Sequence, residues 1–154
     1  MTRYAKPSTP TGSAESMTDS TPTAPNIYPY LRYSDADAAL KWLARAFGFV
    51  ERAAFRGPDG AVAHAEMGIG PGVILLGPAG DGDAPPSPRD PRMARQGIYV
   101  HVDDVDAHYA RAREVGAEIV TELEERRPGE REYYARDLEG YHWTFGTYRP
   151  TSGG

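Results

Sequence analysis

The sequence predicts an α+β fold made of two βαβββ modules, and three observations lead to this prediction. Residues 97–120 have the pattern of a strand, a helix and a second strand. The glycines that would end the two predicted helices, Gly48 and Gly116, lie 68 residues apart. Each glycine is followed by a strand pattern, a Pro/Gly turn and two more strand patterns. Duplication of one small unit explains the three observations together.

The first strand of the second module shows the period of two that is typical of a strand with two different faces. In this strand, Ile98, Val100 and Val102 alternate with Tyr99 and His101. One face is therefore apolar, and the other carries side chains that can form hydrogen bonds.

The helix of the second module follows directly. Asp103 and Asp104 occupy positions where an N-cap and a first helical turn favour a side-chain acceptor and negative charge. Gly116 follows the last turn, where a residue with positive φ commonly ends a helix. Apolar residues at helical spacing predict one buried face, formed by Val105, Tyr109, Ala112 and Val115.

The first module begins with a predicted strand over residues 26–33. One face of this strand carries Tyr28, Tyr30 and Arg32, and the other carries their neighbours in sequence. Ser34 is the predicted N-cap of the helix that follows. The buried stripe of that helix is predicted to consist of Ala36, Leu40, Leu43 and Phe47.

The remaining strands are predicted from alternation and from turn residues. They cover residues 49–55, 61–67, 73–76, 117–125, 131–136 and 141–148. Each module then leaves one face of its sheet bare, so the two modules must close on each other or on a second chain. Trp42 is predicted to pack on its helix, Trp143 to lie in the core, and His108 to be exposed.

Composition sets the boundaries of the domain. Residues 78–96 hold five prolines, which predicts a linker between module one (26–77) and module two (97–148). This linker is either a slack connection or a lid over a cleft. Residues 1–25 are rich in Ser, Thr and Pro and predict a disordered tail, and residues 149–154 predict a second tail. A single domain is therefore expected over residues 26–148.

Charge and residue usage limit the function. The formal charge is −5, and the charges of residues 1–25 cancel, so the domain itself is acidic. An acidic domain without a basic stripe argues against nucleic acid and anionic membranes as partners, and mildly favours neutral or cationic small ligands. The chain has no cysteine, which excludes disulfides, thiolate zinc sites and a cysteine nucleophile. No apolar run approaches the roughly 20 residues that span a bilayer, and residues 1–25 lack a hydrophobic leader. A cytoplasmic protein is expected.

The chain resembles a known superfamily in four segments, which read YPYLRYSDADAALKWLARAFGF, HAEMGIGPGVILLG, GIYVHVDDVDAHYARAREVGAEI and ARDLEGYHWTFGTY. The last two are the more specific, above all the D-x-E-G turn before an aromatic strand. Over residues 26–148 the chain resembles the vicinal oxygen chelate superfamily of glyoxalase I, fosfomycin and bleomycin resistance proteins and extradiol dioxygenases. The match is closest to the PhnB-like branch. The resemblance implies a glyoxalase/bleomycin-resistance-type cleft of two half-barrel sheets, and a homodimer.

The resemblance also tests for a metal site. Metal-dependent members place four ligands, drawn from His, Gln and Glu, on the first and fourth strands of the two modules. By register these positions are Tyr28, Leu75, Gly97 and Thr144, and none has a suitable ligand. A shift of one residue brings in only Gln96. We therefore expect no metal and no other cofactor, as in the bleomycin resistance proteins, which bind a drug without turning it over.

Several side chains on the predicted cleft could contact a ligand. Aromatic walls with a polar tip suit a planar organic molecule, and Arg32 could pair with an anionic group or with Glu66. The alternative is that the tyrosines only fill the barrel or a dimer seam. The predicted ligand-binding residues are Tyr28, Tyr30, Arg32, His64, Glu66, Tyr99, His101, His142 and Thr144.

Three functions remain open at this point. The first is a metal-independent protein that binds a small organic molecule, such as an antibiotic or a metabolite. The second is an enzyme, a lyase, isomerase or dioxygenase, with an acid/base pair or a relocated metal site. Its candidate ligands are His64, Glu66, His101 and His142. The third is an interaction protein whose cleft is filled by its own side chains. No phosphate loop, nucleophile elbow or H-x-x-x-H helix is present, so NTPase, serine hydrolase and metalloprotease functions are not expected.

Overall fold

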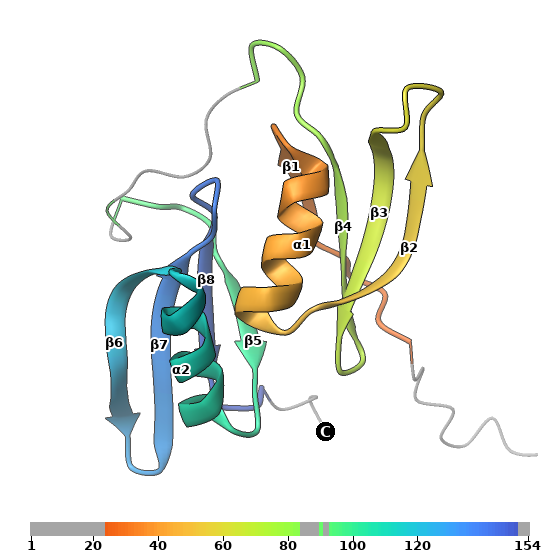
Figure 1. The fold of residues 1–154 in the computed structure, drawn as a ribbon. Coiled ribbons are helices and arrows are strands. Elements are labelled where there is room, and N and C mark those ends of the chain that lie inside the picture. Colours follow the sequence, from red (N-terminus) through yellow and green to blue (C-terminus); the bar gives the residue numbers. More distant parts are fainter. Residues whose placement is uncertain (1–23, 84–89, 91–92, 151–154) are drawn as a thin grey trace, which may run out of the picture.

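The computed structural model of the chain describes residues 24–83, 90 and 93–150 (Figure 1). Its first module contains β1 (Tyr30–Tyr33), α1 (Ala36–Phe47), β2 (Val50–Arg56), β3 (Val62–Ile69) and β4 (Gly72–Pro78). Its second module contains β5 (Ile98–His101), α2 (Val105–Val115), β6 (Glu118–Arg127), β7 (Glu130–Arg136) and β8 (His142–Gly146). The predicted α+β class and the two βαβββ modules are confirmed.

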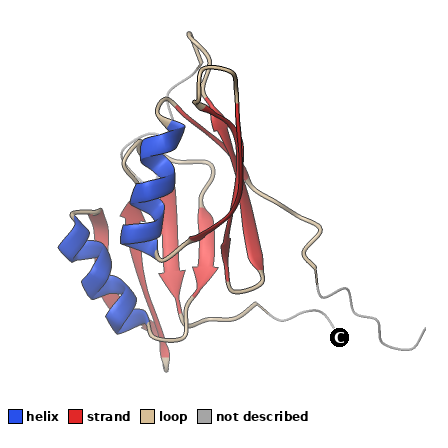
Figure 2. Cartoon of the chain, turned by 45° about the vertical axis from the view of Figure 1, so that its right-hand side comes forward, coloured by secondary structure: helices blue, strands red, loops and turns tan. Residues whose placement is uncertain are grey.

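The two sheets repeat one topology. Their strand orders are β1-β4-β3-β2 and β5-β8-β7-β6, and in each the first strand runs parallel to the last while the other pairs are antiparallel. Tyr30 pairs with Leu75 in the first sheet, and Tyr99 pairs with Thr144 in the second. Residues of β1 and β4 therefore correspond to residues 69 positions later in β5 and β8. Figure 2 shows both helices on the same side of the sheets.

The helix ends follow local chemistry. Gly48 and Gly116 adopt left-handed φ values of 78° and 94°, as predicted for residues that end a helix. The N-cap of α1 is Asp35 and not Ser34, because the Asp35 carboxylate accepts from Ala38 N at 2.9 Å. Asp104 plays the same part for α2, where it accepts from Ala107 N at 3.0 Å.

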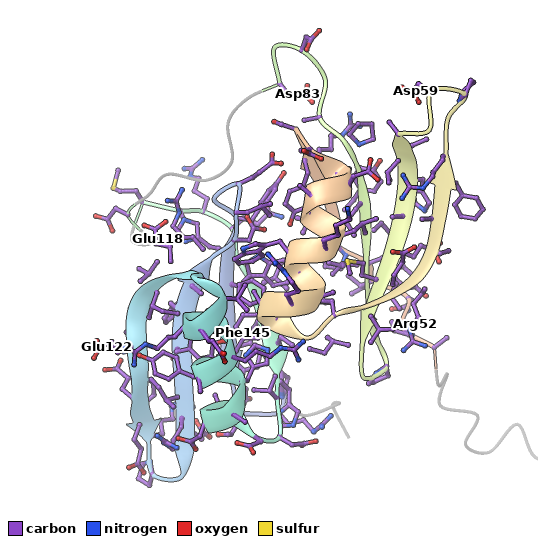
Figure 3. The ribbon with its side chains drawn as sticks, viewed as in Figure 1. Arg52, Asp59, Asp83, Glu118, Glu122 and Phe145 are labelled. Carbon is purple, nitrogen blue, oxygen red and sulfur yellow. The ribbon has the colours of Figure 1, made fainter. Side chains whose placement is uncertain are left out.

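One apolar core joins the modules. Phe47, at the end of α1, packs against Trp143 and Phe145 of β8 with ring centroids 5.7 and 4.6 Å apart. Phe145 lies between the two helices in Figure 3. Trp42 contacts Phe47 edge-on, and Trp143 is fully buried, so both packing predictions are confirmed. The core is shared, and each module depends on the other for its burial.

His108 is not exposed, contrary to the prediction from sequence. Its Nε2 lies 2.8 Å from the carbonyl oxygen of Phe47, and its Nδ1 lies 2.5 Å from the Tyr133 hydroxyl. The prediction failed because it treated α2 as a helix with one buried face. The end of α1 covers a second face, so His108 joins the two modules.

Most strand boundaries also differ from the predictions, the majority by one or two residues and the start of the first strand by four. The first strand begins at Tyr30 and not at residue 26, and Pro29, which has no N–H to continue a ladder, only accepts a bond from Leu75 N at 2.8 Å. The last strand ends at Gly146 instead of residue 148. The described parts of the predicted linker contain no helix or strand beyond Pro78. Most of the predicted N-terminal tail, the middle of the linker and residues 151–154 lie outside the described residues. In the part of the chain that is described, no helix is long and apolar enough to cross a membrane.

Candidate functional site

Two pockets lie along the seam where β1, the edge of the first sheet, faces β5, the edge of the second. Pro29 and Ile98 line both of them. We call the first the Arg32 pocket. It has a volume of about 460 Å³ and is lined by residues that include Tyr30, Arg32, Asp83, Gln96, Tyr141 and His142. We call the second the His101 pocket. It has a volume of about 540 Å³ and is lined by residues that include Ile27, Ile69, Gly72, Tyr99, His101 and Val102.

A turn of module two fastens the seam at the Arg32 pocket. The Tyr141 hydroxyl accepts from Arg32 N at 3.3 Å and donates to the Arg32 carbonyl at 2.7 Å. The Glu139 carboxylate accepts from Ser34 N at 2.6 Å and from Asp35 N at 3.0 Å. These bonds satisfy backbone groups of an edge strand and a helix start that have no partner in their own module. We call Asp137, Glu139 and Tyr141 the clasp.

Asp137 is the buried member of the clasp. Its carboxylate accepts from the Tyr33 hydroxyl at 2.6 Å and from Trp143 Nε1 at 3.1 Å, and also from two backbone N–H groups of its own turn. Burial raises the pKa of this carboxyl above its usual value, and the four donors oppose that rise. Burial together with the Asp137 charge raises the pKa of Tyr33, which therefore remains a protonated donor.

Aromatic side chains form a row on the helix-free face of the first sheet. The Tyr30 ring stacks at 6.5 Å from His64, and His64 lies 6.0 Å from Phe55. Gly77 leaves the space that the Tyr30 hydroxyl occupies. The guanidinium of Arg32 lies 5.6 Å over the Tyr30 ring, and within the described residues it forms no ion pair. This row borders the Arg32 pocket and ends in an open surface.

The Arg32 pocket carries charge of both signs. Arg32 supplies the positive charge, and Asp83, in the loop after β4 (Figure 3), and Glu139 supply negative charge. The Asp83 carboxylate accepts from Gly80 N at 2.6 Å. Both acids are thus held by backbone donors, while the Arg32 guanidinium donates no hydrogen bond to another described residue.

The predicted site residues divide into groups. Tyr30, Arg32 and His142 meet in the Arg32 pocket, and Tyr99 and His101 line the His101 pocket. The others line neither pocket: His64, Glu66, Thr144 and Tyr28.

These four residues have separate surroundings. His64 and Glu66 lie 3.5 Å apart on the open face beside Tyr30. Thr144 pairs with Tyr99 and with Tyr134 in the second sheet. Tyr28 is exposed and its hydroxyl donates to the carbonyl of Pro25. The predicted residues therefore do not share one pocket within the chain.

Four positions correspond by register to the metal ligands of the superfamily. Leu75 and Gly97 have no side-chain donor atom there, and the side chains of Tyr28 and Thr144 each offer a hydroxyl. The candidate ligands of a relocated metal site were His64, Glu66, His101 and His142. Among the residues that the structure describes, no three His, Asp or Glu side chains come close enough together to hold a metal ion. His101 contacts Asp103 and the Tyr148 carbonyl.

Sequence reasoning missed the clasp as part of the site. The D-x-E-G turn was identified, but only as a turn and a mark of resemblance. The available signal was the pair Glu139 and Tyr141, whose alternation in the turn directs both side chains toward β1.

A duplicated βαβββ unit with pockets between the edge strands of its two sheets defines a class of paired-module proteins. The model of the Glyoxalase/Bleomycin resistance protein/Dioxygenase superfamily matches residues 25–145, and the chain belongs to this superfamily. The resemblance predicted from the sequence is thereby confirmed, while the PhnB-like branch stays a prediction.

The chain is similar to several individual proteins. It is 34% identical over 125 residues to Uncharacterized protein Mb0911c of Mycobacterium bovis, covering 79% of this chain and 82% of that protein. The crystal structure of TioX from Micromonospora sp. ML1 matches with 32% identity and a TM-score of 0.63, covering 84% of this chain and all of that one. The fosfomycin resistance protein FosX of Listeria monocytogenes matches with 16% identity and a TM-score of 0.60, covering 80% and 92%. This last likeness shows the fold alone.

Proposed function

We propose that the chain binds a small organic molecule in the Arg32 pocket and does so without the superfamily's usual metal site. The observation that carries this proposal is the Arg32 guanidinium, which lies over Tyr30, has no ion-pair partner within the described residues and lines a pocket of about 460 Å³. Pockets of this size hold drug-sized ligands and use a few placed polar groups for orientation.

The surroundings narrow the ligand class. A planar part can lie against the Tyr30 ring in the pocket, and an acceptor group can reach Arg32. Because Asp83 and Glu139 outnumber Arg32, the pocket suits a ligand that is neutral or positively charged overall. An antibiotic or a metabolite of this kind is the proposed ligand, and binding alone would sequester it.

Ligand-observed NMR with a mixed set of antibiotics and aromatic metabolites would test the proposal. Hits should compete with one another, and Arg32→Gln and Tyr30→Leu should each weaken them by about tenfold or more. Lys41→Gln, on the exposed side of α1, is the control and should change nothing. Hits that bind both variants as tightly as the parent chain would show that the pocket has another role.

A homodimer and a cytoplasmic location are part of the proposal. Val50 and Phe55 are 58% and 59% exposed on the first sheet, an apolar area that a second copy could cover. Sedimentation velocity should then give twice the chain mass of 16.8 kDa, and Phe55→Glu should return the monomer. A monomeric parent chain would contradict this part and leave the binding proposal standing.

A further inference from the structure

The two pockets occupy equivalent places in the two halves of the fold. With the offset of 69 residues, Arg32 corresponds to His101, Gln96 to Ile27, and His142 to Val73. The first member of each pair lines the Arg32 pocket; His101, Ile27 and Val73 line the other. The duplication has therefore produced two equivalent pockets along the seam, and we call each of them a socket.

The two sockets differ in the residue that faces the backbone of the neighbouring edge strand. In the Arg32 pocket, Tyr141 places its hydroxyl between the N–H and the carbonyl of Arg32, and its ring packs edge-on against Tyr33 with centroids 5.1 Å apart. The residue that corresponds to Tyr141 in the first module is Gly72. Gly72 lines the His101 pocket but has no side chain to enter it.

The backbone of His101 faces this gap. Val102 N bonds to the Gly146 carbonyl, so the backbone groups of the even-numbered residues of this segment point toward β8. By alternation, the N–H and the carbonyl of His101 point the other way, into the seam. In the described parts of the chain, neither of these two groups has a hydrogen-bond partner.

The walls of the His101 pocket suit an aromatic ring. Val102 stands where Tyr33 stands in the other half, and Phe49, Ile69 and Ile74 add apolar surface. A wall of this kind with one donor and one acceptor at its base resembles the surroundings of Tyr141.

We propose that the His101 pocket is a second ligand site and that it binds a phenol, whose hydroxyl accepts from the His101 N–H and donates to the His101 carbonyl. The ring then occupies the place that the Tyr141 ring occupies in the other half. The site does not depend on the ligand proposed for the Arg32 pocket, because the two pockets share only Pro29 and Ile98 among their lining residues.

Three small probes test the chemistry on the unaltered chain. The first is p-cresol, which has the structure of a tyrosine side chain. Toluene lacks the hydroxyl, and 4-methylanisole can accept a hydrogen bond but cannot donate one. Titration followed by amide NMR should show p-cresol shifting the His101 resonance and binding about tenfold or more tightly than either analogue. Equal affinities for the three compounds, or no shift at His101, would overturn the proposal.

Substitution of Gly72 provides the matching test. Gly72→Tyr places a phenol in the socket from within the chain and should abolish p-cresol binding. Lys41→Gln, on the exposed side of α1, is the control and should bind p-cresol as the parent does. Undiminished p-cresol binding to a folded Gly72→Tyr chain would overturn the proposal. Loss of this site should leave hits at the Arg32 pocket unchanged, so the two proposals fail separately.

Discussion

Asp137 holds the two modules together through one buried carboxylate. This carboxylate accepts hydrogen bonds from the Tyr33 hydroxyl of module one and from Trp143 Nε1 of module two at the same time. Buried donors that lose their acceptor keep the full cost of desolvation, so the carboxylate matters more for what it satisfies than for its charge.

Replacing Asp137 should therefore be costly. Asp137→Ala leaves the Tyr33 hydroxyl, Trp143 Nε1 and two backbone N–H groups without an acceptor, and should lower the free energy of unfolding by about 3 kcal/mol or more. Asp137→Asn keeps one acceptor oxygen and should lose about half as much. Urea unfolding of both variants measures this. A loss below about 1 kcal/mol for Asp137→Ala would contradict the role of the clasp.

His108 makes stability depend on pH. The Phe47 carbonyl can only accept, so Nε2 carries the proton and Nδ1 accepts from the Tyr133 hydroxyl, which is the neutral form of the ring. Burial lowers the pKa of His108 below its usual value, and the nearby Arg111 adds to this, while the bond to Phe47 opposes it.

The unfolded chain therefore binds this proton more tightly than the folded chain. The contribution of His108 is complete above the unfolded pKa of about 6.5 and is lost as the pH falls through the lower folded pKa. Urea unfolding at pH 7.5 and 5.5 should show a larger loss for the parent chain than for His108→Gln, which keeps a donor and an acceptor and does not titrate. Equal losses would mean that His108 is charged in the fold.

For single residues, the sequence predicted the face of the sheet on which a side chain lies better than which side chains share a pocket. Parity placed Tyr30 and Arg32 on the helix-free face, as the structure has them. Strand alternation does not show which pocket a residue lines. The structure therefore has Tyr99 and His101 in one pocket and Arg32 in the other, although the sequence predicted one site for all three. The sequence analysis did not include Tyr141 in the site because its hydroxyl bonds to the backbone of Arg32. Every residue carries such backbone groups, so residue types do not reveal the contact.

Among the elements, α1 depends on α2 for its last turn. Arg111 donates to the carbonyls of Arg45 and Ala44 at 2.7 and 2.9 Å, and His108 reaches the carbonyl of Phe47. These are carbonyls that a helix leaves unpaired at its C-terminus. The glycine that follows then turns the chain back toward β2.

That turn requires glycine. Gly48 has φ of 78°, and a Cβ at this position would meet only Arg111 Nη1 at 3.6 Å, so backbone strain is the main cost of a side chain. Gly48→Ala should lower the free energy of unfolding by about 1–2 kcal/mol. Gly72→Ala, where φ is not left-handed, is the matched control and should cost less than about 0.5 kcal/mol. Thermal unfolding by circular dichroism compares them, and similar losses in both would contradict the strain argument.

Element types were predicted throughout, and boundaries were less accurate. Hydrophobic period and helix-ending glycines mark every strand and helix of the two modules. The first strand was predicted four residues too long at its start. Its alternation continues through Tyr28, but pairing stops where Pro29 offers no N–H. Ser34 and Asp35 are both good N-cap residues. The structure has Asp35 at the cap, because its carboxylate accepts from Ala38 N.

The whole molecule should unfold as one unit. Phe47 of module one contacts Trp143 and Phe145 of module two, and the clasp adds polar bonds across the seam. Halves that share a core lose most of their burial when they separate. The linker between them therefore joins parts that are not independently stable.

Urea unfolding with two probes checks this. In Trp42→Phe the remaining tryptophan, Trp143, reports on module two, while far-UV circular dichroism reports on both modules. The two curves should coincide with one midpoint. A separate earlier transition in either signal would show that the modules unfold independently.

The one-sided clasp has a consequence for how such a chain can change over generations. A chain with two equivalent pockets can keep the function of one pocket while substitutions accumulate in the other. Here the three clasp side chains bond across the seam at one copy, while Ile69, Gly70 and Gly72 stand at the matching turn of the other. A lineage with this arrangement can acquire a second specificity by substitutions at the glycine turn and keep its first one intact.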